Sequence, residues 1–286
     1  MIRYPVGWER ILNVVSIALM LVTFGCTSRR APTGPALKPL VLAWQDEFDG
    51  PAGQPPDTIT KWRYDVGVGP GNDGWGNNQL EYDTNRPENV SLDGNGHLTI
   101  VARREDYLGR AYTSARINTR GRFEQTRGRF EARMKLPSGQ GLWPAFWLLG
   151  ADFGTVGWPT CGEIDIMEYR GQEPRIAHGA LHGPGYSGGS ALTGQFELPQ
   201  GAFDTGFHIF AVEWSADRIT WFVDGIAYKS ATPGDLPTGK NWVFNHPFFV
   251  ILNVAVGGNY VGGPGPGTTF PQTMTVDYVR VYAAGP

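Results

Sequence analysis

The sequence predicts an all-β protein, folded as one large β-sandwich. Three observations carry this prediction. The 286 residues include 40 Gly and 22 Pro, which favour turns and interrupt helices. Several segments alternate apolar and polar side chains with a period of two, and no long segment keeps a helical period. Hydrophobic residues make up 41% of the chain, which is ample for a core.

The overall charge argues against one class of partner. The chain has 24 Lys and Arg against 27 Asp and Glu, a formal net charge of -3. Binding to the phosphate backbone of nucleic acid needs a basic excess, so nucleic acid is not expected as a partner. An uncharged polymer is a better expectation for the binding partner. We also expect the protein to be a monomer.

Residues 1–26 are predicted to be an export signal. Residues 11–24 are almost wholly apolar, a length typical of a signal peptide and short for a membrane span. The segment before Cys26 resembles a bacterial lipoprotein processing site, although Thr23 stands where such sites usually have Leu. Lipidation of Cys26, ordinary cleavage nearby and an uncleaved anchor all stay open. Each predicts an extracellular or cell-envelope location.

The remainder of the chain divides into a tether and one domain. Residues 27–39 carry three prolines among polar and small residues, which is typical of a linker. Residues 40–286 form one continuous pattern without repeats, charge runs or an internal linker. This length lies within the range of single all-β domains.

The first strands of the domain are inferred from turns and alternation. Asp93 and Gly94 predict a turn before a strand at residues 98–101. Residues 129–136 alternate charged and apolar side chains, so one face of this strand is predicted to be buried and the other wet.

Later strands follow the same logic. Residues 209–214 and 219–223 are apolar on both faces, which predicts central strands between two layers. Asp224 and Gly225 then predict a two-residue hairpin turn into a strand at residues 226–228.

Cys161 is the single Cys beyond the export segment. No disulfide framework and no Cys-containing metal cluster is therefore predicted. A nucleophilic thiol would need a neighbouring His as its base, so we interpret Cys161 as a small buried hydrophobe.

The residues that can carry chemistry concentrate at positions 163–169. In a regular strand Glu163 and Asp165 share one face, and strict alternation would send Glu168 to the opposite, apolar face. Burying a carboxylate there is costly, so we infer a β-bulge near Met167 that returns Glu168 to the first face. The three acids then form a ladder, and their mutual repulsion must split their pKa values. Such a ladder adds no stability, which indicates a function.

Aromatic residues surround this acid ladder in the sequence. Trp143 and Trp147 share one face of the preceding strand, and Trp75, Trp158 and Tyr169 lie in flanking segments. Aromatic rings stack on the C–H faces of sugars, so exposed rings beside acids are typical of a saccharide cleft. Any one of these rings could instead belong to the core, and two acids alone could be a solvated strand face.

Two carboxylates on either side of a glycosidic bond can hydrolyse it. One attacks the anomeric carbon to form a glycosyl-enzyme, and the other protonates the leaving oxygen and later deprotonates water. This retaining reaction needs carboxyl groups about 5–5.5 Å apart, whereas an inverting reaction needs a wider separation. Glu163 and Glu168 can lean toward each other on a concave sheet, with Asp165 between them, so we favour the retaining reaction.

These residues resemble the signature of glycoside hydrolase family 16. The signature is EIDIME at residues 163–168, in the bulged form with an extra Met, and the resemblance runs from about Val41 to Tyr282. It includes GWGNN at 74–78, YTSARI at 112–117, GRFEAR at 128–133 and GLWPAFW at 141–147. Together these segments resemble the bacterial laminarinase branch, endo-acting β-1,3-glucanases with a jelly-roll sandwich and a concave substrate cleft.

The resemblance implies roles for the acids and for a set of substrate-binding residues. It implies Glu163 as nucleophile, Asp165 as its assistant and Glu168 as acid/base, with no cofactor for catalysis. The implied substrate-binding residues are Trp143 and Trp147 at the donor subsites, His182 near the acid/base, and Asn78, Arg116 and Asn253 as hydrogen-bonding partners of glucose hydroxyls.

Two of these positions keep an alternative, and one neighbouring segment departs from the family pattern. Arg116 could equally form an ion pair on a strand face, and His182 could be a satisfied loop histidine. The family often has Glu and then Gln after the paired Asn, where this chain has Gln79 and Glu81. That exchange leaves the local substrate contacts open.

Many relatives also hold a structural Ca²⁺ on the convex face. The matching ligands here would be the carbonyls of Glu47 and Gly94 and the carboxylate of Asp277, all oxygens as a hard cation requires. Asp277 could instead face solvent.

The expected activity is retaining endo-hydrolysis of β-1,3-glucosidic bonds in a laminarin-like β-glucan. A mixed-linkage β-1,3/1,4-glucanase and a glucan transglycosylase stay open, because they use the same covalent intermediate. The same sandwich also builds non-catalytic glucan-binding modules. A binding module would have no reason to keep three mutually repelling acids on one face.

Overall fold

The computed structural model describes residues 39–284. The predicted export signal at 1–26, including Cys26, and the predicted tether at 27–39 apart from Pro39 lie outside the described residues. Within the described part of the chain, no helix has the length and apolar character needed to cross a membrane.

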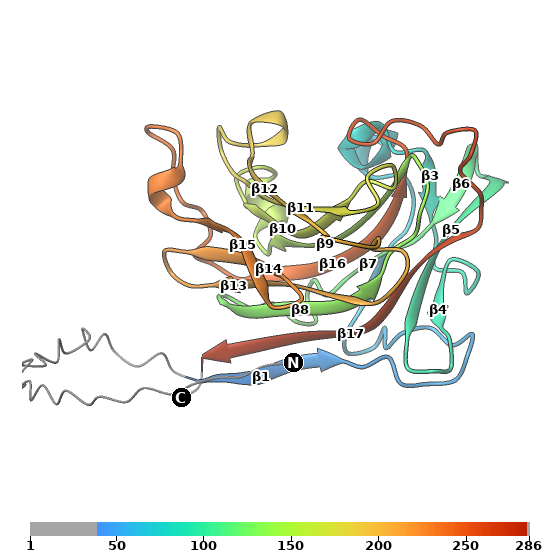
Figure 1. Ribbon diagram of the computed structural model, residues 1–286, viewed down its shortest axis with the longest axis horizontal. Helices are drawn as coiled ribbons and strands as arrows, with labels where there is room; N and C mark the ends of the chain where they lie inside the picture. Colours follow the sequence, from blue (N-terminus) through green and yellow to red (C-terminus); the bar gives the residue numbers. More distant parts are fainter. Residues whose placement is uncertain (1–38, 285–286) are drawn as a thin grey trace, which may run out of the picture. The chain divides into compact units, whose positions relative to one another are not determined.

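Two largely antiparallel sheets build the described domain (Figure 1). The larger sheet has ten strands in the order β15-β14-β13-β8-β17-β5-β6-β3, with β1 paired to β17 and β4 paired to β5. The smaller sheet has seven strands in the order β12-β11-β10-β9-β16-β7-β2. The pair β3 and β6 is parallel. The predicted all-β sandwich is confirmed.

The strands of the larger sheet are β1 (Leu40–Asp46), β3 (Glu81–Asp83), β4 (Val90–Leu92), β5 (Leu98–Tyr107), β6 (Arg110–Ser114), β8 (Gly128–Lys135), β13 (His208–Trp214), β14 (Ile219–Val223), β15 (Ile226–Ala231) and β17 (Gln272–Ala284). Those of the smaller sheet are β2 (Arg63–Asp65), β7 (Arg116–Asn118), β9 (Leu142–Gly150), β10 (Glu163–Tyr169), β11 (Ile176–His182), β12 (Leu192–Glu197) and β16 (Phe248–Val256). The helical turns are short, namely η1 (Pro70–Asn72), η2 (Gly74–Asn78), α1 (Phe153–Val156), η3 (Gly188–Ser190) and η4 (Pro233–Asp235).

The core fills the space between the two sheets. In β8 the apolar members of the predicted alternation, Phe130, Ala132 and Met134, are fully buried. In β16 every residue is buried, and Asn253 is the polar residue in an otherwise apolar strand. A polar side chain at that depth needs a hydrogen-bond partner.

The strands β13 and β14 differ from the prediction that both of their faces are covered. Glu213 is exposed, and Thr220 and Phe222 are half-buried. Among residues 39–284 no third layer covers the outer face of the larger sheet, so an apolar side chain there is covered by neighbours on the same sheet. The Arg129 guanidinium lies 5.3 Å from the centre of the Phe222 ring and covers that ring.

Both predicted turns are confirmed. Asp224 and Gly225 have φ values of 49° and 78°, the positive pair that a type I′ hairpin requires between β14 and β15. In the turn between β4 and β5, the Asp93 carboxylate accepts hydrogen bonds from the backbone N–H groups of Asn95 and His97 at 2.7 and 3.1 Å.

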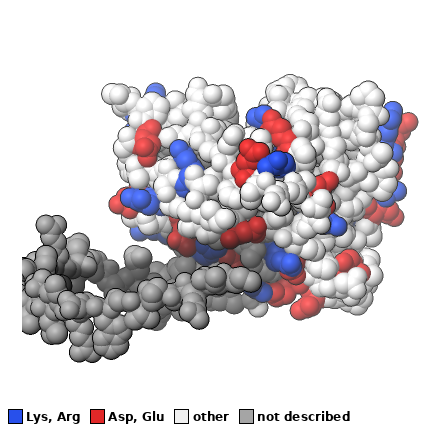
Figure 2. All heavy atoms as spheres, viewed as in Figure 1, with Lys and Arg blue, Asp and Glu red and all other residues white. Residues whose placement is uncertain are grey.

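The smaller sheet forms the floor of a groove. In Figure 1 the loops at the two ends of its strands rise above it on opposite sides, and the space-filling view in Figure 2 is hollowed between these two walls. Within that sheet β10 is an interior strand, paired with β11 on one side and β9 on the other.

Candidate active site

Three carboxylates lie on the groove side of β10. In the pairing with β11, Glu163 lies opposite His182 and Asp165 opposite Ala180, but Glu168 lies opposite His178. Three steps along β10 therefore match two steps along β11, which confirms the predicted β-bulge. The pairing with β9 shifts in the same place.

The bulge separates the acids from the apolar residues of the same strand. Ile164, Ile166 and Met167 are buried in the core at 0 to 1% exposure. The side chains of Glu163 and Asp165 keep 16% and 4% of their surface exposed. Glu163 is thus reachable from the groove, and Asp165 lies beneath it.

The position of the acids raises their proton affinity. Burial raises the pKa of Glu163 and of Asp165 from their usual values, and repulsion from Asp165 adds to the shift of Glu163. Burial, with repulsion from Asp165, raises the pKa of Glu168 to about 8. His182 and Arg116 lower the pKa of Glu163, and His182 and the Trp143 N–H lower the pKa of Glu168, so these neighbours favour ionisation of both glutamates.

His182 lies against the lower part of the ladder. Its Nε2 atom is 3.0 Å from Asp165 Oδ2 and 3.6 Å from Glu163 Oε1. Among the described contacts, Glu168 instead accepts a hydrogen bond from Trp143 Nε1 at 3.0 Å. His182 therefore lies closest to Asp165 and Glu163, while its charge also acts on the pKa of Glu168, and its expected place near the acid/base stays a prediction. The register of β11 carries His178, and not His182, opposite Glu168.

Glu163, Asp165 and His182 also form a group whose ligand atoms lie within 4.8 Å of one another, close enough to hold a metal ion. The backbone N–H of Gly188 donates to His182 Nδ1 at 3.0 Å. Because Nδ1 accepts, the ring proton resides on Nε2, and that nitrogen has no lone pair to offer a metal. The donor set does not favour a metal here.

Three other predicted binding residues, Trp147, Asn253 and Arg116, cluster on the groove floor. Trp147 Nε1 donates to Asn253 Oδ1 at 2.8 Å, which satisfies the buried amide of β16. The Arg116 guanidinium lies 4.8 Å from the centre of the Trp147 ring and also pairs with Asp65 at 3.0 Å. Arg116 therefore forms the ion pair that was its alternative, and its hydrogen bond to a glucose hydroxyl stays a prediction.

Asn78 lies in a separate part of the groove wall. Its Nδ2 atom donates to Asn259 Oδ1 at 3.0 Å, which ties η2 to the loop after β16. Gln79 and Glu81 are the positions at which this chain departs from the family pattern. Glu81 is buried and accepts a hydrogen bond from the backbone N–H of Val256 at 2.7 Å. Glu81 is therefore part of the framework and does not reach the groove.

The flanking aromatics divide between groove and core. Trp75 lies 4.5 Å from the Arg116 guanidinium, and Trp158 is 47% exposed with its ring 6.0 Å from that of His182. Tyr169 is fully buried and packs edge-on against Phe203. Its inclusion among the cleft aromatics is wrong, because the bulge returns Glu168 to the groove and places the next residue in the core.

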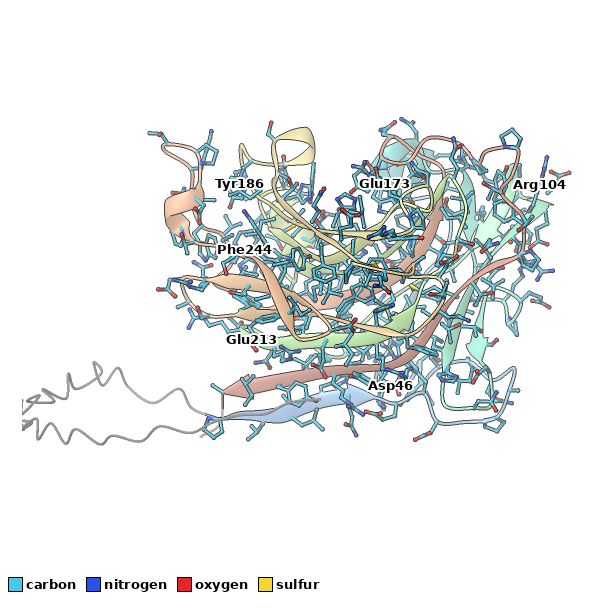
Figure 3. The ribbon with its side chains drawn as sticks, viewed as in Figure 1. Asp46, Arg104, Glu173, Tyr186, Glu213 and Phe244 are labelled. Atoms are coloured by element: carbon cyan, nitrogen blue, oxygen red, sulfur yellow. The ribbon has the colours of Figure 1, made fainter. Side chains whose placement is uncertain are left out.

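Sequence reasoning missed a cluster beside Glu168. Tyr260 lies 5.0 Å from Trp143 between ring centres, and the Arg170 guanidinium lies 4.1 Å from the centre of the Tyr260 ring. Glu173, labelled on the groove rim in Figure 3, bonds His178 at 2.9 Å. No local motif marks these residues, because they come from three separate segments.

The comparisons with known proteins agree with this geometry. A family model described as glycosyl hydrolases family 16 matches residues 75–280. The chain belongs to this family. It is 42% identical over 275 residues to the "Beta-glucanase" of Rhodothermus marinus, an alignment covering 92% of each chain.

Solved family 16 structures resemble the whole described domain. The laminarinase catalytic domain from Thermotoga maritima is 47% identical with a TM-score of 0.81, covering 86% of this chain and 99% of that one. The endo-beta-1,3-glucanase from Pyrococcus furiosus is 46% identical with a TM-score of 0.81, covering 87% and 97%. The jelly-roll architecture predicted for this family 16 chain is therefore confirmed.

The predicted calcium ligands of this family 16 chain lie on paired strands and a turn of the larger sheet. Asp46 pairs with Val279, which brings the following Glu47 near Asp277, and the turn holding Gly94 precedes β5, whose Leu98 pairs with Val276. The Asp277 carboxylate pairs with Arg133, so a Ca²⁺ ion would share it with a guanidinium. The calcium site stays a prediction.

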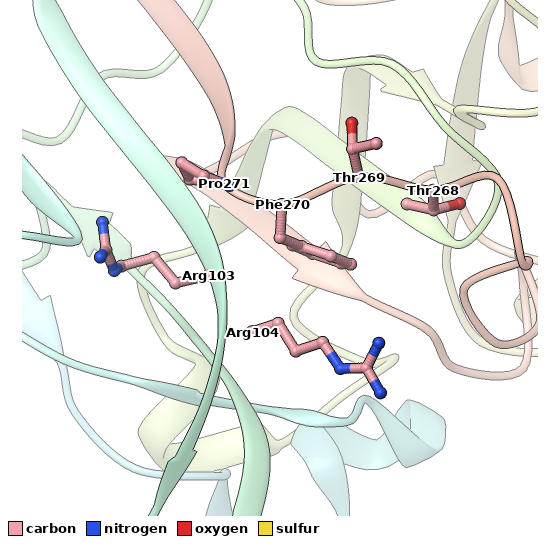
Figure 4. Close-up of a pocket in the computed structure, with 6 residues that line it drawn as sticks. All are labelled: Arg103, Arg104, Thr268, Thr269, Phe270 and Pro271. Carbon is pink, nitrogen blue, oxygen red and sulfur yellow. The ribbon is translucent and has the colours of Figure 1, made fainter.

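Two other features of the family 16 chain lie outside its groove. Cys161 is free and fully buried, and burial raises its thiol pKa to about 12, as expected for an inert thiol. A pocket of 510 Å³ lies between β5 and the loop before β17 (Figure 4). In Figure 4 the side chains of Arg103 and Arg104 point away from each other, so they do not converge on one ligand.

Proposed function

We propose that the protein hydrolyses internal β-1,3-glucosidic bonds of a laminarin-like β-glucan, with retention of the anomeric configuration. The observation that carries the proposal is the bulge in β10, which turns three carboxylates toward a groove lined by tryptophans. Family 16 membership and the similarity to solved laminarinases support the substrate class.

The first step forms a covalent intermediate. Glu168, whose pKa is raised by burial and by repulsion from Asp165, donates its proton to the glycosidic oxygen. The Glu163 carboxylate attacks the anomeric carbon as the bond to that oxygen breaks. Asp165 lies between them on the same face and supports the attacking carboxylate.

The second step releases the sugar. Glu168, now ionised, takes a proton from water, and the water oxygen attacks the anomeric carbon while the bond to Glu163 breaks. Two inversions give net retention, and both glutamates return to their starting protonation states. Trp143 and Trp147 provide ring faces along the sugar path.

Product analysis tests this proposal. Laminarin should be cut to a ladder of short oligosaccharides, and the first product detected by proton NMR should be the β-anomer, with α appearing later by mutarotation. An α-anomer at the earliest time points would overturn the double displacement. Absence of any cleavage of laminarin would overturn the function.

Two other activities follow from the same intermediate. A mixed-linkage β-1,3/1,4-glucanase would cut lichenan at a comparable rate, and a transglycosylase would pass the glucosyl group to a sugar and lengthen oligosaccharides. Parallel assays on laminarin and lichenan, with added acceptor oligosaccharides, separate the three. A pure binding module would retain affinity for laminarin without products.

We also propose export and attachment to a membrane by a lipid on Cys26. The apolar segment 11–24 and the processing-like site before Cys26 support this. The full-length chain should partition into detergent after expression in a bacterial host, and Cys26→Ala should abolish labelling by a radioactive fatty acid. An unlabelled wild-type chain in the culture medium would point to ordinary secretion instead.

We keep a structural Ca²⁺ and a monomeric state as predictions. A chelator should lower the melting temperature by a few degrees, and added Ca²⁺ should restore it, because a ligand bound only to the folded state stabilises it. Asp277→Asn should remove this response. A monomer should elute from a sizing column at the position expected for a mass near 31.3 kDa or less after signal removal.

A further inference from the structure

The hydrogen bond from Trp143 to Glu168 depends on how the indole ring is held. That ring lies in a small apolar cluster with Ala255 and Val261, apart from the main core, and Tyr260 packs against it. The Trp143 and Tyr260 ring centres are 5.0 Å apart, with their planes at 45°. Tyr260 and Val261 both come from the loop after β16, so this loop determines where the indole N–H points.

The segment after β10 holds this loop in two ways. The Arg170 guanidinium lies 4.1 Å from the centre of the Tyr260 ring. Gln172 Nε2 donates to the Val261 carbonyl at 3.0 Å, and Gln172 Oε1 accepts a hydrogen bond from the backbone N–H of Gly141 at 3.3 Å. The loop is therefore held both at the Tyr260 side chain and at its backbone.

Arg170 is itself fixed by an anion. Its Nη1 atom donates to Glu173 Oε1 at 3.1 Å, and Glu173 Oε2 lies 2.9 Å from His178 Nε2. Burial opposes ionisation of Glu173, but the hydrogen bond with His178 and the charge of Arg170 hold its pKa below the usual value. An ionised carboxylate only accepts hydrogen bonds, so Glu173 positions the guanidinium over Tyr260.

These contacts form a closed circuit of side chains. It runs from Glu168 to Trp143, then to Tyr260 and Arg170. Arg170 follows Glu168 after one intervening residue, so the circuit closes along the backbone. The acid and the residue that holds the loop thus belong to the same segment of the chain.

We propose that Tyr260 is a positioning residue that keeps the Trp143 indole N–H on Glu168, and that Arg170 and Gln172 hold Tyr260 in place. This inference rests on the proposed function, because it takes Glu168 as the group that exchanges a proton with the substrate. Tyr260 acts through Trp143, which is the residue that bonds the carboxylate.

Direct stacking of Tyr260 on the glucan is the alternative role. A stacking platform needs a free ring face. The Arg170 guanidinium covers one face of the Tyr260 ring, and the rings of Trp143 and His178 lie 5.0 and 6.2 Å from it between centres. Protein groups therefore occupy the surroundings of this ring, which favours the positioning role.

Several charged and titratable groups face Glu168. They are Glu163 and Asp165 on the same strand, His178 and His182 on β11, Arg170 after β10, Tyr228 on β15 and Tyr260 after β16. Loss of the Trp143 hydrogen bond raises the pKa of Glu168, whereas water admitted beside a smaller side chain lowers it. The two effects oppose each other in a pH profile, so the test reads the indole N–H directly.

Two substitutions at Tyr260 separate its ring from its hydroxyl. Tyr260→Phe keeps the ring against Trp143, and Tyr260→Leu removes it. The Trp143 indole N–H is followed by proton NMR, as the resonance that is missing from Trp143→Phe. In Tyr260→Leu its exchange with water should become about tenfold faster or more, the loss expected for a hydrogen bond to a charged group. In Tyr260→Phe the exchange rate should stay within about twofold of wild type.

Gln172→Ala tests the hold on the loop without changing Glu168, Trp143 or Tyr260. Gln172 is exposed, so its replacement leaves the core intact. Loss of its bond to the Val261 carbonyl should speed exchange of the same indole N–H by about two- to fivefold.

Turnover provides a second measurement. Tyr260→Leu should lower kcat on laminarin by about three- to tenfold. In the Trp143→Phe background the same substitution should lower kcat by no more than about twofold further, because the contact through which Tyr260 acts is already absent.

The outcomes separate this inference from the proposed function. An unchanged indole exchange rate in Tyr260→Leu or in Gln172→Ala would overturn the inference. So would equal effects of Tyr260→Phe and Tyr260→Leu, or full multiplication of the two kcat losses in the double variant, which would indicate direct contact of Tyr260 with the glucan. Failure of the wild-type protein to cleave laminarin would instead overturn the proposed function, and the exchange measurement would still stand by itself.

Discussion

Two clusters of carboxylates with raised pKa values lie in the described domain, one on β10 and one on β3. In both, burial is the main cause of a raised pKa: Glu168 on β10 rises to about 8 and Glu81 on β3 to about 7, and that of Asp83 also rises. The clusters differ in access. Glu163 keeps 16% of its side chain exposed, whereas Glu81 and Asp83 are 1% and 2% exposed as whole residues.

This difference shows that a perturbed pKa alone does not locate an active site. Glu81 accepts the backbone N–H of Val256 and so joins β3 to the end of β16. Among the described contacts, Glu163 on β10 accepts no hydrogen bond from a backbone N–H. Its side chain lies between His182 and the groove. Access from the groove, which the bulge in β10 creates, distinguishes the carboxylates on β10 from the structural carboxylates on β3.

The strongest test of this comparison replaces one acid in each cluster. Glu163→Gln and Glu168→Gln should each lower kcat on laminarin by about a thousandfold or more, because each removes a reacting group. Glu81→Gln should leave kcat within about threefold, since the amide oxygen still accepts the Val256 N–H. All three variants should keep the wild-type circular dichroism spectrum. Equal losses in Glu81→Gln and Glu163→Gln would show that the β3 cluster takes part in the reaction.

A second test separates the two groove tryptophans. The Trp143 N–H lowers the pKa of Glu168. Trp143→Phe removes it, so the Glu168 pKa should rise and the alkaline limb of the pH profile should move up, with kcat lower by roughly tenfold at neutral pH.

Trp147→Phe is the matched control for that substitution. It removes the bond to Asn253 and leaves Glu168 untouched. Its KM should rise while the alkaline limb stays in place. A shift of the limb in both variants would mean that the change comes from the groove in general and not from the Trp143 hydrogen bond.

A third test asks whether both clusters carry the same cost in stability. A carboxyl whose pKa is raised on folding holds a proton that the unfolded chain has lost, so the free energy of unfolding falls as pH rises from the unfolded pKa to the folded one. For Glu81 that window runs from 4.5 to about 7.

Glu81→Gln should therefore raise the melting temperature by a few degrees at pH 8 and change it little at pH 4.5 or below. Asp165→Asn should behave in the same way, although it lies in the other cluster. Thermal melts of both variants across this range provide the measurement. A Glu81→Gln protein that is stabilised equally at every pH would contradict the assignment to proton linkage.

The smallest expected effect concerns Tyr169, which follows the ladder but faces the core. Its buried hydroxyl has no hydrogen-bond partner among the described residues. Tyr169→Phe should leave kcat and KM unchanged and should not lower the melting temperature, because it removes an unsatisfied polar group. A loss of substrate binding in Tyr169→Phe would show that this ring takes part in the groove.

Much of this protein could be inferred from the sequence because the deciding physics is local. Alternation in residues 129–136 predicts a strand with one buried face, and the cost of burying Glu168 among Ile164 and Ile166 predicts the bulge before any neighbour is known. Strand period and carboxylate solvation depend on residues next to one another in the chain.

Tertiary structure alone decided which side chains meet across strands. The register of β10 against β11 places His182 on Asp165 and His178 opposite Glu168, and the fold sets Arg133 on Asp277. The tautomer of His182 depends on a loop that Tyr186 anchors to the Asn241 carbonyl 55 residues away. A sequence pattern cannot specify these contacts, because a one-residue change in register would exchange every cross-strand partner.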